Sequence, residues 1–290
     1  MSLQWNYISG VDFKVVSGGC VCLTQPGNLS FTPYNDFMYY QDPNPFGKPA
    51  VLLLHGLGTD GASWAFQIPA LLSKGMRPII LDIPGFGKSP LEKKNWSIAD
   101  AAAEIAGLIS NNLAGSLVLV GISMGGTIAI QIALDYPQYV ERLVLVNTFA
   151  ALRPNRLKDL SYLAVRFIRA NLLGVHAQAE MVAWRIFPEA GQEPLRKILI
   201  NSILQSDPAV YRAAMRSLGL FDVKKRLQQI KIPTLVVTGT LDSMVPPAVQ
   251  AVLAEKIPGA QQVFITGGRH AVIVDQPERF NQVLLDFLLR

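Results

Sequence analysis

A serine lies between glycines in VLVGISMGGTIAI, the stretch from Val118 to Ile130. Gly121, Ser123 and Gly125 fit the pattern G-x-S-x-G, in which a sharp strand-to-helix turn exposes a serine hydroxyl for attack on a carbonyl carbon. In a chain with 23 glycines the pattern also arises by chance. Its context must therefore decide whether Ser123 is a nucleophile or only a small residue in a tight turn.

A serine hydroxyl needs a base that accepts its proton, and the chain has only three histidines. His270 follows the apolar run VFIT, where a strand is expected to end, and we predict that it is the base. His55 also ends an apolar run, but the sequence GLG after it indicates another role. His176 lies in a segment with a helical pattern, where a surface or helix-capping histidine is expected.

The base in turn needs an acid that orients it. Asp242 comes soon after the apolar run TLVVTG, at a second expected strand end. Another strand end, after RLVLV, holds Asn147 and Thr148, and neither has a carboxylate. Elimination leaves the order Ser123, Asp242, His270, which is the order that accompanies a G-x-S-x-G turn on an α/β sheet.

The attacked carbonyl oxygen becomes an oxyanion, and two backbone N–H groups would stabilise it. One candidate is the N–H of Met124, the residue after the serine. The second is the N–H of Leu57, in the loop that follows the apolar run VLLLHG. Gly56 and Gly58 flank Leu57 and allow the backbone to turn close to a substrate.

The elements that position these residues are predicted from short apolar runs. The runs are continuous rather than alternating, which is typical of strands buried on both faces of a parallel sheet. They are residues 51–56, 78–83, 116–121, 142–147, 234–239 and 261–267. Because ligands bind outside the carboxyl ends of such strands, the three candidate catalytic residues are expected to meet at that edge.

Helical patterns separate the apolar runs. One begins at Ser97, whose Asp100 three residues later resembles a capping box, and another covers 127–136 and stops before Pro137. A third, amphipathic pattern ends the chain at 277–290. Alternating strands and helices predict a doubly wound, mostly parallel sheet. The β-favouring pieces 11–16 and 37–43 predict antiparallel strands leading into it.

Residues 151–226 interrupt this alternation, because they contain helical patterns only. We predict a helical cap, inserted into a core made of residues 1–150 and 227–290. The cap has 13 Lys and Arg against six Asp and Glu, a net charge of +7. A solvated surface explains this charge most simply, and attraction of an anionic substrate is the alternative. The apolar stripe of 155–173 favours a lid helix over contact with a membrane surface.

The composition sets further limits. Half of the residues are apolar and 16% are charged, which is typical of a globular protein. Cys20 and Cys22 are too close along the chain to imply a disulfide framework, so a cytoplasmic location is expected. No secretory signal, membrane span or nucleic-acid-binding pattern is predicted. The oligomeric state stays open.

The motifs together resemble the α/β-hydrolase fold superfamily over nearly the whole chain. The matching pieces are VLLLHGLG, LDIPGFGKS, GISMGG, YPQYVERLVLVN, IPTLVVTGTLDSMVP and GGRHAVIVDQPERF. Within the superfamily the chain is most similar to small capped serine esterases and lactonases, including the 3-oxoadipate enol-lactonase-like group. The resemblance implies a lid over about 151–226 and no cofactor, and we expect no metal. It also implies structural rather than chemical roles for Asp82 and Gly85.

The expected reaction is hydrolysis of a small ester or lactone through an acyl-enzyme. Alternatives are carbon–carbon bond cleavage or acyl transfer with the same triad, and a receptor-like protein with little turnover. Dehalogenase and epoxide-hydrolase relatives carry aspartate where this chain has Ser123, which argues against both. Carbon–carbon hydrolases usually have an aromatic residue after the histidine, where Ala271 stands. Arg269 replaces the usual small residue before it, and either a solvated charge or an anion-binding group is expected.

Overall fold

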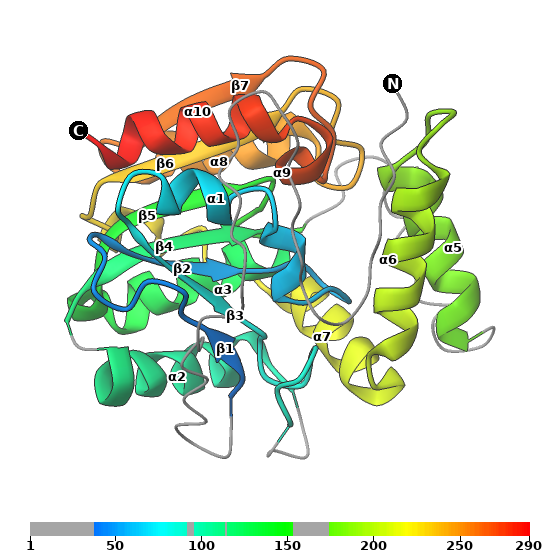
Figure 1. Cartoon of the computed structure of the whole chain (residues 1–290), viewed down its shortest axis with the longest axis horizontal. Coiled ribbons are helices and arrows are strands. Elements are labelled where there is room, and N and C mark those ends of the chain that lie inside the picture. Colours follow the sequence, from blue (N-terminus) through cyan, green and yellow to red (C-terminus); the bar gives the residue numbers. More distant parts are fainter. Residues whose placement is uncertain (1–37, 92–95, 114, 153–173) are drawn as a thin grey trace. The chain divides into compact units, whose positions relative to one another are not determined.

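A computed structural model describes residues 38–91, 96–113, 115–152 and 174–290 of the chain. Within these residues seven strands form one sheet, in the order β1-β3-β2-β4-β5-β6-β7 (Figure 1). The strands are β1 Tyr40–Gln41, β2 Ala50–Leu54, β3 Arg77–Leu81, β4 Leu117–Ile122, β5 Val140–Val146, β6 Thr234–Gly239 and β7 Gln261–Ile265. Only β1 pairs antiparallel, with β3, whereas the pairs from β3 through β7 are parallel.

The six predicted apolar runs are confirmed as the strands β2 to β7. The antiparallel strand predicted from 37–43 is confirmed as the short β1, and the piece 11–16 lies outside the described residues. The predicted doubly wound, mostly parallel α/β sheet is therefore confirmed.

Helices connect the strands and cover both faces of the sheet. The helices are α1 Ile68–Leu72, α2 Ile98–Leu108, α3 Met124–Asp135, α5 Gly174–Ile186, α6 Glu193–Gln205, α7 Pro208–Leu220, α8 Pro247–Lys256, α9 Val272–Asp275 and α10 Pro277–Leu288. Figure 1 shows α2 and α3 on one side of the sheet and α10 on the other. Of the helices that the structure describes, none has the length and apolar content needed to cross a bilayer.

The strands bury side chains on both faces because successive residues point in opposite directions. On β4, Leu117 and Leu119 belong to the buried cluster that includes residues of α2 and α3. Val118 and Val120 belong to a second cluster, which includes residues of α10. Two cores thus share one sheet, and this explains why the strand sequences are apolar throughout rather than alternating.

Of the three core helices predicted from the sequence, α2 and α10 begin where expected and α3 does not. Ser97 caps α2 as predicted, because its Oγ accepts a hydrogen bond from the Asp100 N–H at 3.0 Å. The helix expected at 127–136 begins earlier, at Met124, and includes Gly125 and Gly126. Glycine disfavours helix, so its presence in the first turn of α3 requires a reason from packing.

The segment predicted as a cap contains the helices α5, α6 and α7. A single antiparallel bridge joins Ala151 to Asp222, near the two ends of the segment. The apolar stripe predicted for 155–173 lies outside the described residues.

Candidate active site

Ser123 occupies the turn between β4 and α3. Its backbone has φ 53° and ψ −114°, and in the described part of the chain only Ser123 and Asn147 combine a side chain with positive φ. Such a conformation costs about 1–3 kcal/mol and persists only where the surroundings enforce it. Here the Ser123 N–H donates to Val146 O at 3.0 Å, and Thr148 Oγ1 donates to Ser123 O at 2.6 Å. The neighbouring strand β5 therefore holds the turn.

The glycines around Ser123 allow backbones to approach closely. A Cβ atom on Gly121 would lie 2.3 Å from Gly125 O, and one on Gly125 would lie 2.1 Å from Leu54 O. A Cβ on Gly126 would lie 2.5 Å from Thr148 Cβ. All three distances are far below van der Waals contact. Close packing of α3 on the strand ends thus requires glycine here and outweighs its poor helix propensity.

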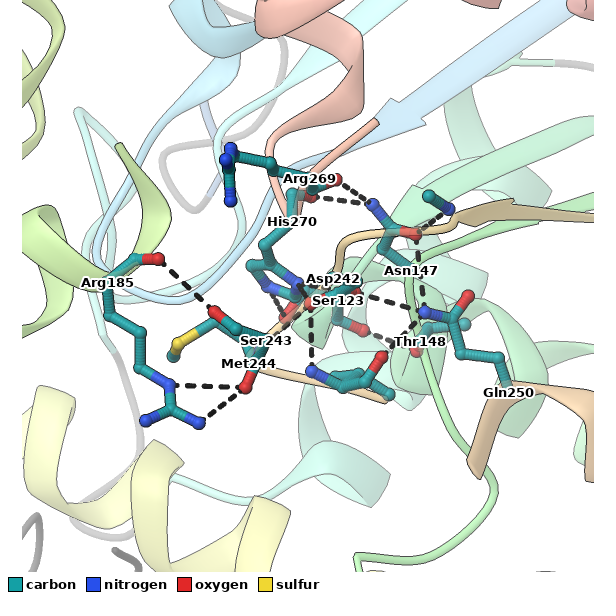
Figure 2. Close-up of polar contacts among 12 residues, drawn as sticks. Ser123, Asn147, Thr148, Arg185, Asp242, Ser243, Met244, Gln250, Arg269 and His270 are labelled. Carbon is teal, nitrogen blue, oxygen red and sulfur yellow. Dashed lines mark hydrogen bonds and ion pairs between the residues drawn. The ribbon is translucent and has the colours of Figure 1, made fainter. Parts of the chain in front are cut away.

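The three residues predicted to act together lie in one line of contacts (Figure 2). His270 Nε2 is 3.1 Å from Ser123 Oγ, and His270 Nδ1 is 3.0 Å from Asp242 Oδ2 and 3.1 Å from Oδ1. They come from the ends of three strands, β4, β6 and β7, as the parallel sheet requires. Asp242 and His270 are both buried, so water screens their interaction little.

The Asp242 carboxylate has a full set of donors. Its Oδ1 accepts hydrogen bonds from the Met244 N–H at 2.8 Å and the Val245 N–H at 3.0 Å. Its Oδ2 accepts from Gln250 Nε2 at 3.1 Å. A buried charge is tolerated only when it is paired and hydrogen-bonded, and these donors together with His270 meet that requirement.

A second polar side chain, Asn147, links the same loops. Its Nδ2 donates to Arg269 O and His270 O, both at 2.8 Å. Its Oδ1 accepts from the Gly239 N–H at 2.8 Å and from Gln250 Nε2 at 3.3 Å. The sequence drew attention to Asn147 only as a strand end without a carboxylate. The available signal was an asparagine at that strand end, since asparagine tolerates positive φ better than most residues.

The predicted oxyanion loop lies beside the serine. A Cβ on Gly56 would be 3.8 Å from Ser123 Cβ, so the loop that contains Leu57 starts next to the nucleophile turn. Met124 is the first residue of α3, and first-turn N–H groups have no partner within their helix. The first backbone hydrogen bond of the helical pattern is made by the Thr127 N–H, which donates to Ser123 O at 3.1 Å.

Comparisons with known proteins agree with this architecture. Residues 51–283 match the alpha/beta hydrolase family. The chain belongs to the alpha/beta hydrolase family. It is 33% identical to the Variovorax paradoxus protein named carbamate hydrolase RutD, with 87% of this chain and 96% of that one covered. It is 29% identical to the pimeloyl-[acyl-carrier protein] methyl ester esterase of Aeromonas hydrophila, covering 84% and 97%.

A solved structure of a lactonase has a similar fold. The enol-lactonase from Burkholderia xenovorans LB400 has a TM-score of 0.78 and 27% identity, covering 87% of this chain and 96% of that one. The predicted α/β-hydrolase fold and the predicted resemblance to hydrolases of the esterase and lactonase type are thus confirmed.

The other two histidines of this hydrolase, His55 and His176, have different surroundings from His270. His55 is fully buried, its Nε2 accepts from the Ile83 N–H at 2.9 Å, and its Nδ1 donates to Gly56 O at 2.8 Å. Burial lowers the pKa of His55, so the neutral ring is favoured. His176 is exposed and lies 3.9 Å from Glu180. In neither case does the geometry suit a base for Ser123.

Asp82 has the structural environment that the resemblance implied. Its two carboxylate oxygens accept hydrogen bonds from the Gly61 and Lys88 N–H groups, each at 2.8 Å. Burial raises the pKa of Asp82, and the two backbone donors oppose that effect. Gly85 has φ +83°, which explains the glycine there. Within the described residues, no group of three His, Cys, Asp or Glu side chains has the arrangement of a metal site.

The helices α5 to α7 of this hydrolase contact the loops around the candidate site. A Cβ on Gly58 would lie 2.8 Å from Ile203 of α6 and 2.8 Å from Tyr211 of α7. Arg185 of α5 donates twice to Ser243 O, at 2.6 and 3.2 Å, directly after Asp242 (Figure 2). The helices therefore pack on the loop after β2 and on the loop of the acid.

Arg269, beside His270, forms an ion pair. Its Nη2 is 2.8 Å from Glu189 Oε1, in the connection between α5 and α6. The Arg269 side chain is 23% exposed and that of Glu189 is 60% exposed. Arg269 was expected to be either solvated or available for an anion. Its guanidinium instead pairs with a carboxylate from the predicted cap.

Proposed function

We propose that this protein hydrolyses a carboxylic ester or lactone through an acyl-enzyme on Ser123. The observation that carries the proposal is the position of His270, whose two ring nitrogens face Ser123 Oγ at 3.1 Å and the Asp242 carboxylate at 3.0 Å. A nucleophile, a base and an orienting acid in that order are what acyl transfer needs. Membership of the hydrolase family and the relatives' names support the same class of reaction.

The first half of the reaction forms the acyl-enzyme. His270 Nε2 takes the proton of Ser123 Oγ as the oxygen attacks the carbonyl carbon. The N–H groups of Leu57 and Met124 hold the oxyanion, aided by the positive end of the α3 dipole. The tetrahedral intermediate collapses, the ester C–O bond breaks, and His270 gives its proton to the departing alcohol oxygen.

The second half releases the acid. Water replaces the alcohol, His270 removes a proton from it, and the resulting hydroxide attacks the acyl carbon. Collapse of the second intermediate returns the proton to Ser123 Oγ. In both halves Asp242 orients the ring and stabilises its charged form. The scheme needs no cofactor.

The cap is part of the proposal. Residues 151–226 form a helical cap between the core segments 1–150 and 227–290, and they enclose a small ester-like substrate. Contacts of Ile203 and Tyr211 with the loop of Leu57 support this division. A cytoplasmic location accords with a sequence that has only two cysteines.

The test compares Ser123→Ala with wild type on short p-nitrophenyl esters and on lactones of graded ring size. We expect Ser123→Ala to lower kcat about 10⁴- to 10⁶-fold, while the melting temperature and circular dichroism stay close to wild type. The control is Ser73→Ala, since Ser73 lies in the turn after α1 and is exposed. Substantial ester hydrolysis by folded Ser123→Ala would overturn the proposal.

A second measurement separates an enzyme from a receptor-like protein. A fluorophosphonate probe reacts only with an activated serine hydroxyl, so we expect rapid labelling of wild type and none of Ser123→Ala. Folded wild-type protein that is not labelled would overturn the assignment of an active nucleophile.

A further inference from the structure

The Asn147 side chain has hydrogen-bond partners at both ends of its amide. Its two N–H donors face the carbonyl oxygens of Arg269 and His270, and its oxygen faces the Gly239 N–H and Gln250 Nε2 (Figure 2). Carbonyl oxygens can only accept and a backbone N–H can only donate. The surroundings therefore fix the orientation of the amide and demand a side chain that donates at one end and accepts at the other.

The backbone of Asn147 is tied just as firmly. The residue follows β5, is fully buried, and has φ 45°. Its own N–H donates to Val237 O of β6 at 3.0 Å, and the preceding residue, Val146, accepts from the Ser123 N–H at 3.0 Å. Asn147 is thus fixed to the strand ends on either side, between the nucleophile turn and the strand that leads to Asp242.

Gln250 extends the network to the acid. Its Nε2 lies 2.7 Å from Val245 O, 3.1 Å from Asp242 Oδ2 and 3.3 Å from Asn147 Oδ1, so two hydrogens are shared among three acceptors and the contact with Asn147 is the longest. Since Gln250 belongs to α8 and Asn147 to the end of β5, the carboxylate and the histidine loop are held by two amides that contact each other. A shift of either amide would alter the distance between Asp242 and His270.

We propose that Asn147 is a positioning residue, which holds the main chain of His270 and, through Gln250, the carboxylate of Asp242 at the distances needed to activate Ser123. The inference rests on the proposed function, because it assigns a part in the same reaction. Asn147 does not touch the reacting atoms in this arrangement. Its effect is expected on the activation of the serine and not on substrate binding.

Three substitutions separate the contributions of the side chain and the backbone. Asn147→Asp has nearly the same shape and keeps the acceptor end, but it turns an oxygen toward the carbonyls of Arg269 and His270. Asn147→Gly removes the side chain and accepts positive φ without strain. Asn147→Ala removes the side chain and adds backbone strain. If the hydrogen bonds from Asn147 Nδ2 to the two carbonyl oxygens position His270, all three variants must lose activity.

We expect kcat for a short p-nitrophenyl ester and the rate of fluorophosphonate labelling to fall together by about 10- to 100-fold, with KM within about twofold of wild type. The expected loss reflects the sensitivity of proton transfer to small displacements. The matched control is Asn281→Ala, which removes a partly buried amide whose Nδ2 donates to Phe66 O and whose Oδ1 accepts from Gln67 Nε2. Asn281→Ala is expected to lower the melting temperature and leave the labelling rate of the folded protein unchanged.

Two outcomes would overturn the inference. One is a folded Asn147→Gly or Asn147→Asp protein that is labelled at the wild-type rate, since the donor bonds would then be dispensable. The other is a rise in KM with kcat unchanged. If Asn147→Ala fails to fold, the glycine and aspartate variants carry the test. Labelling of Ser123→Ala would instead contradict the proposed function itself, so the two failures are distinguishable.

Discussion

Two buried histidines at strand ends of this protein have very different surroundings. Both rings of His55 and His270 are enclosed, and each has an aspartate nearby, Asp82 and Asp242 respectively. The nitrogens of His55 make their short hydrogen bonds to the backbone, at Ile83 N and Gly56 O, and Thr59 Oγ1 lies farther away, at 3.4 Å. Those of His270 face two side chains, a hydroxyl and a carboxylate. Backbone partners fix a neutral ring in one tautomer, whereas a hydroxyl and a carboxylate allow a proton to arrive and leave.

The two aspartates, Asp82 and Asp242, also have different partners. Asp82 accepts one backbone N–H from its own loop, that of Lys88, and one from the loop after β2, that of Gly61, so it joins two segments of the chain. Asp242 accepts two N–H groups of its own turn and offers both oxygens to a ring. A carboxylate that contacts a histidine side chain can stabilise its charged form, and one that only joins backbones contributes to stability.

Removing each histidine should give the largest contrast. His270→Ala is expected to lower kcat for p-nitrophenyl esters about 10⁴- to 10⁶-fold, with a smaller loss of unfolding free energy than His55→Ala, because Asp242 keeps its three other donors. His55→Ala leaves the buried Ile83 N–H without its acceptor and creates a cavity, so the free energy of unfolding should fall by about 3 kcal/mol. Urea unfolding and steady-state kinetics on the same preparations measure both effects. Equal losses of kcat in folded samples of the two variants would contradict the distinction.

Replacing each aspartate should likewise separate an effect on activity from an effect on stability. Asp242→Asn is expected to lower kcat about 10⁴-fold, because an amide cannot stabilise the charged ring and favours the wrong tautomer. Asp82→Asn would place an amide nitrogen against a backbone N–H and is expected to cost about 1–3 kcal/mol of unfolding free energy. Loss of ester hydrolysis in an Asp82→Asn protein with the melting temperature of wild type would show that Asp82 has a chemical role.

The sequence predicted the sheet and the candidate triad because both depend on local signals. A strand buried on two faces must be continuously apolar, and residues that act at the carboxyl edge must directly follow such strands. Ser123, Asp242 and His270 satisfied this requirement, and the structure brings them together. Their roles in catalysis are still a proposal that the substitutions above test.

Other features depend on contacts that no local pattern records. Gly125 and Gly126 argued against helix at the start of α3, yet their closeness to Leu54 and Thr148 becomes visible only when the strands are paired. The contact of Gln250 with Asp242 depends on how α8 packs. The choice of substrate depends on the direction of side chains in the predicted cap, and helical periodicity does not give that direction.

The pH dependence of stability offers a smaller test of the first histidine. Burial lowers the pKa of His55 below its usual 6.5, so the unfolded chain binds a proton more readily than the folded one as pH falls through 6.5. The free energy of unfolding should therefore decrease on going from pH 7.5 toward pH 5.5, by at most about 1.4 kcal/mol per pH unit for this group. Nearby Asp82 acts in the opposite direction at lower pH, because burial raises its pKa.

His55→Gln isolates the histidine contribution, since glutamine does not titrate. Urea unfolding of both proteins at several pH values measures the difference. We expect the variant to lose less stability than wild type between pH 7.5 and 5.5. Parallel curves for the two proteins would contradict the assigned effect of burial.

The ion pair beside His270 should have the smallest effect. Glu189→Gln removes the partner of Arg269, but the Glu189 side chain is 60% exposed and water screens the pair. The free energy of unfolding should change by less than about 1 kcal/mol, and the change should shrink further as salt is added. Activity on p-nitrophenyl esters should stay within about twofold, because the Arg269 main chain is held separately by Asp275 Oδ2 and Asn147 Nδ2. A large loss of kcat in Glu189→Gln would mean that the cap, and not only the strand ends, sets the position of His270.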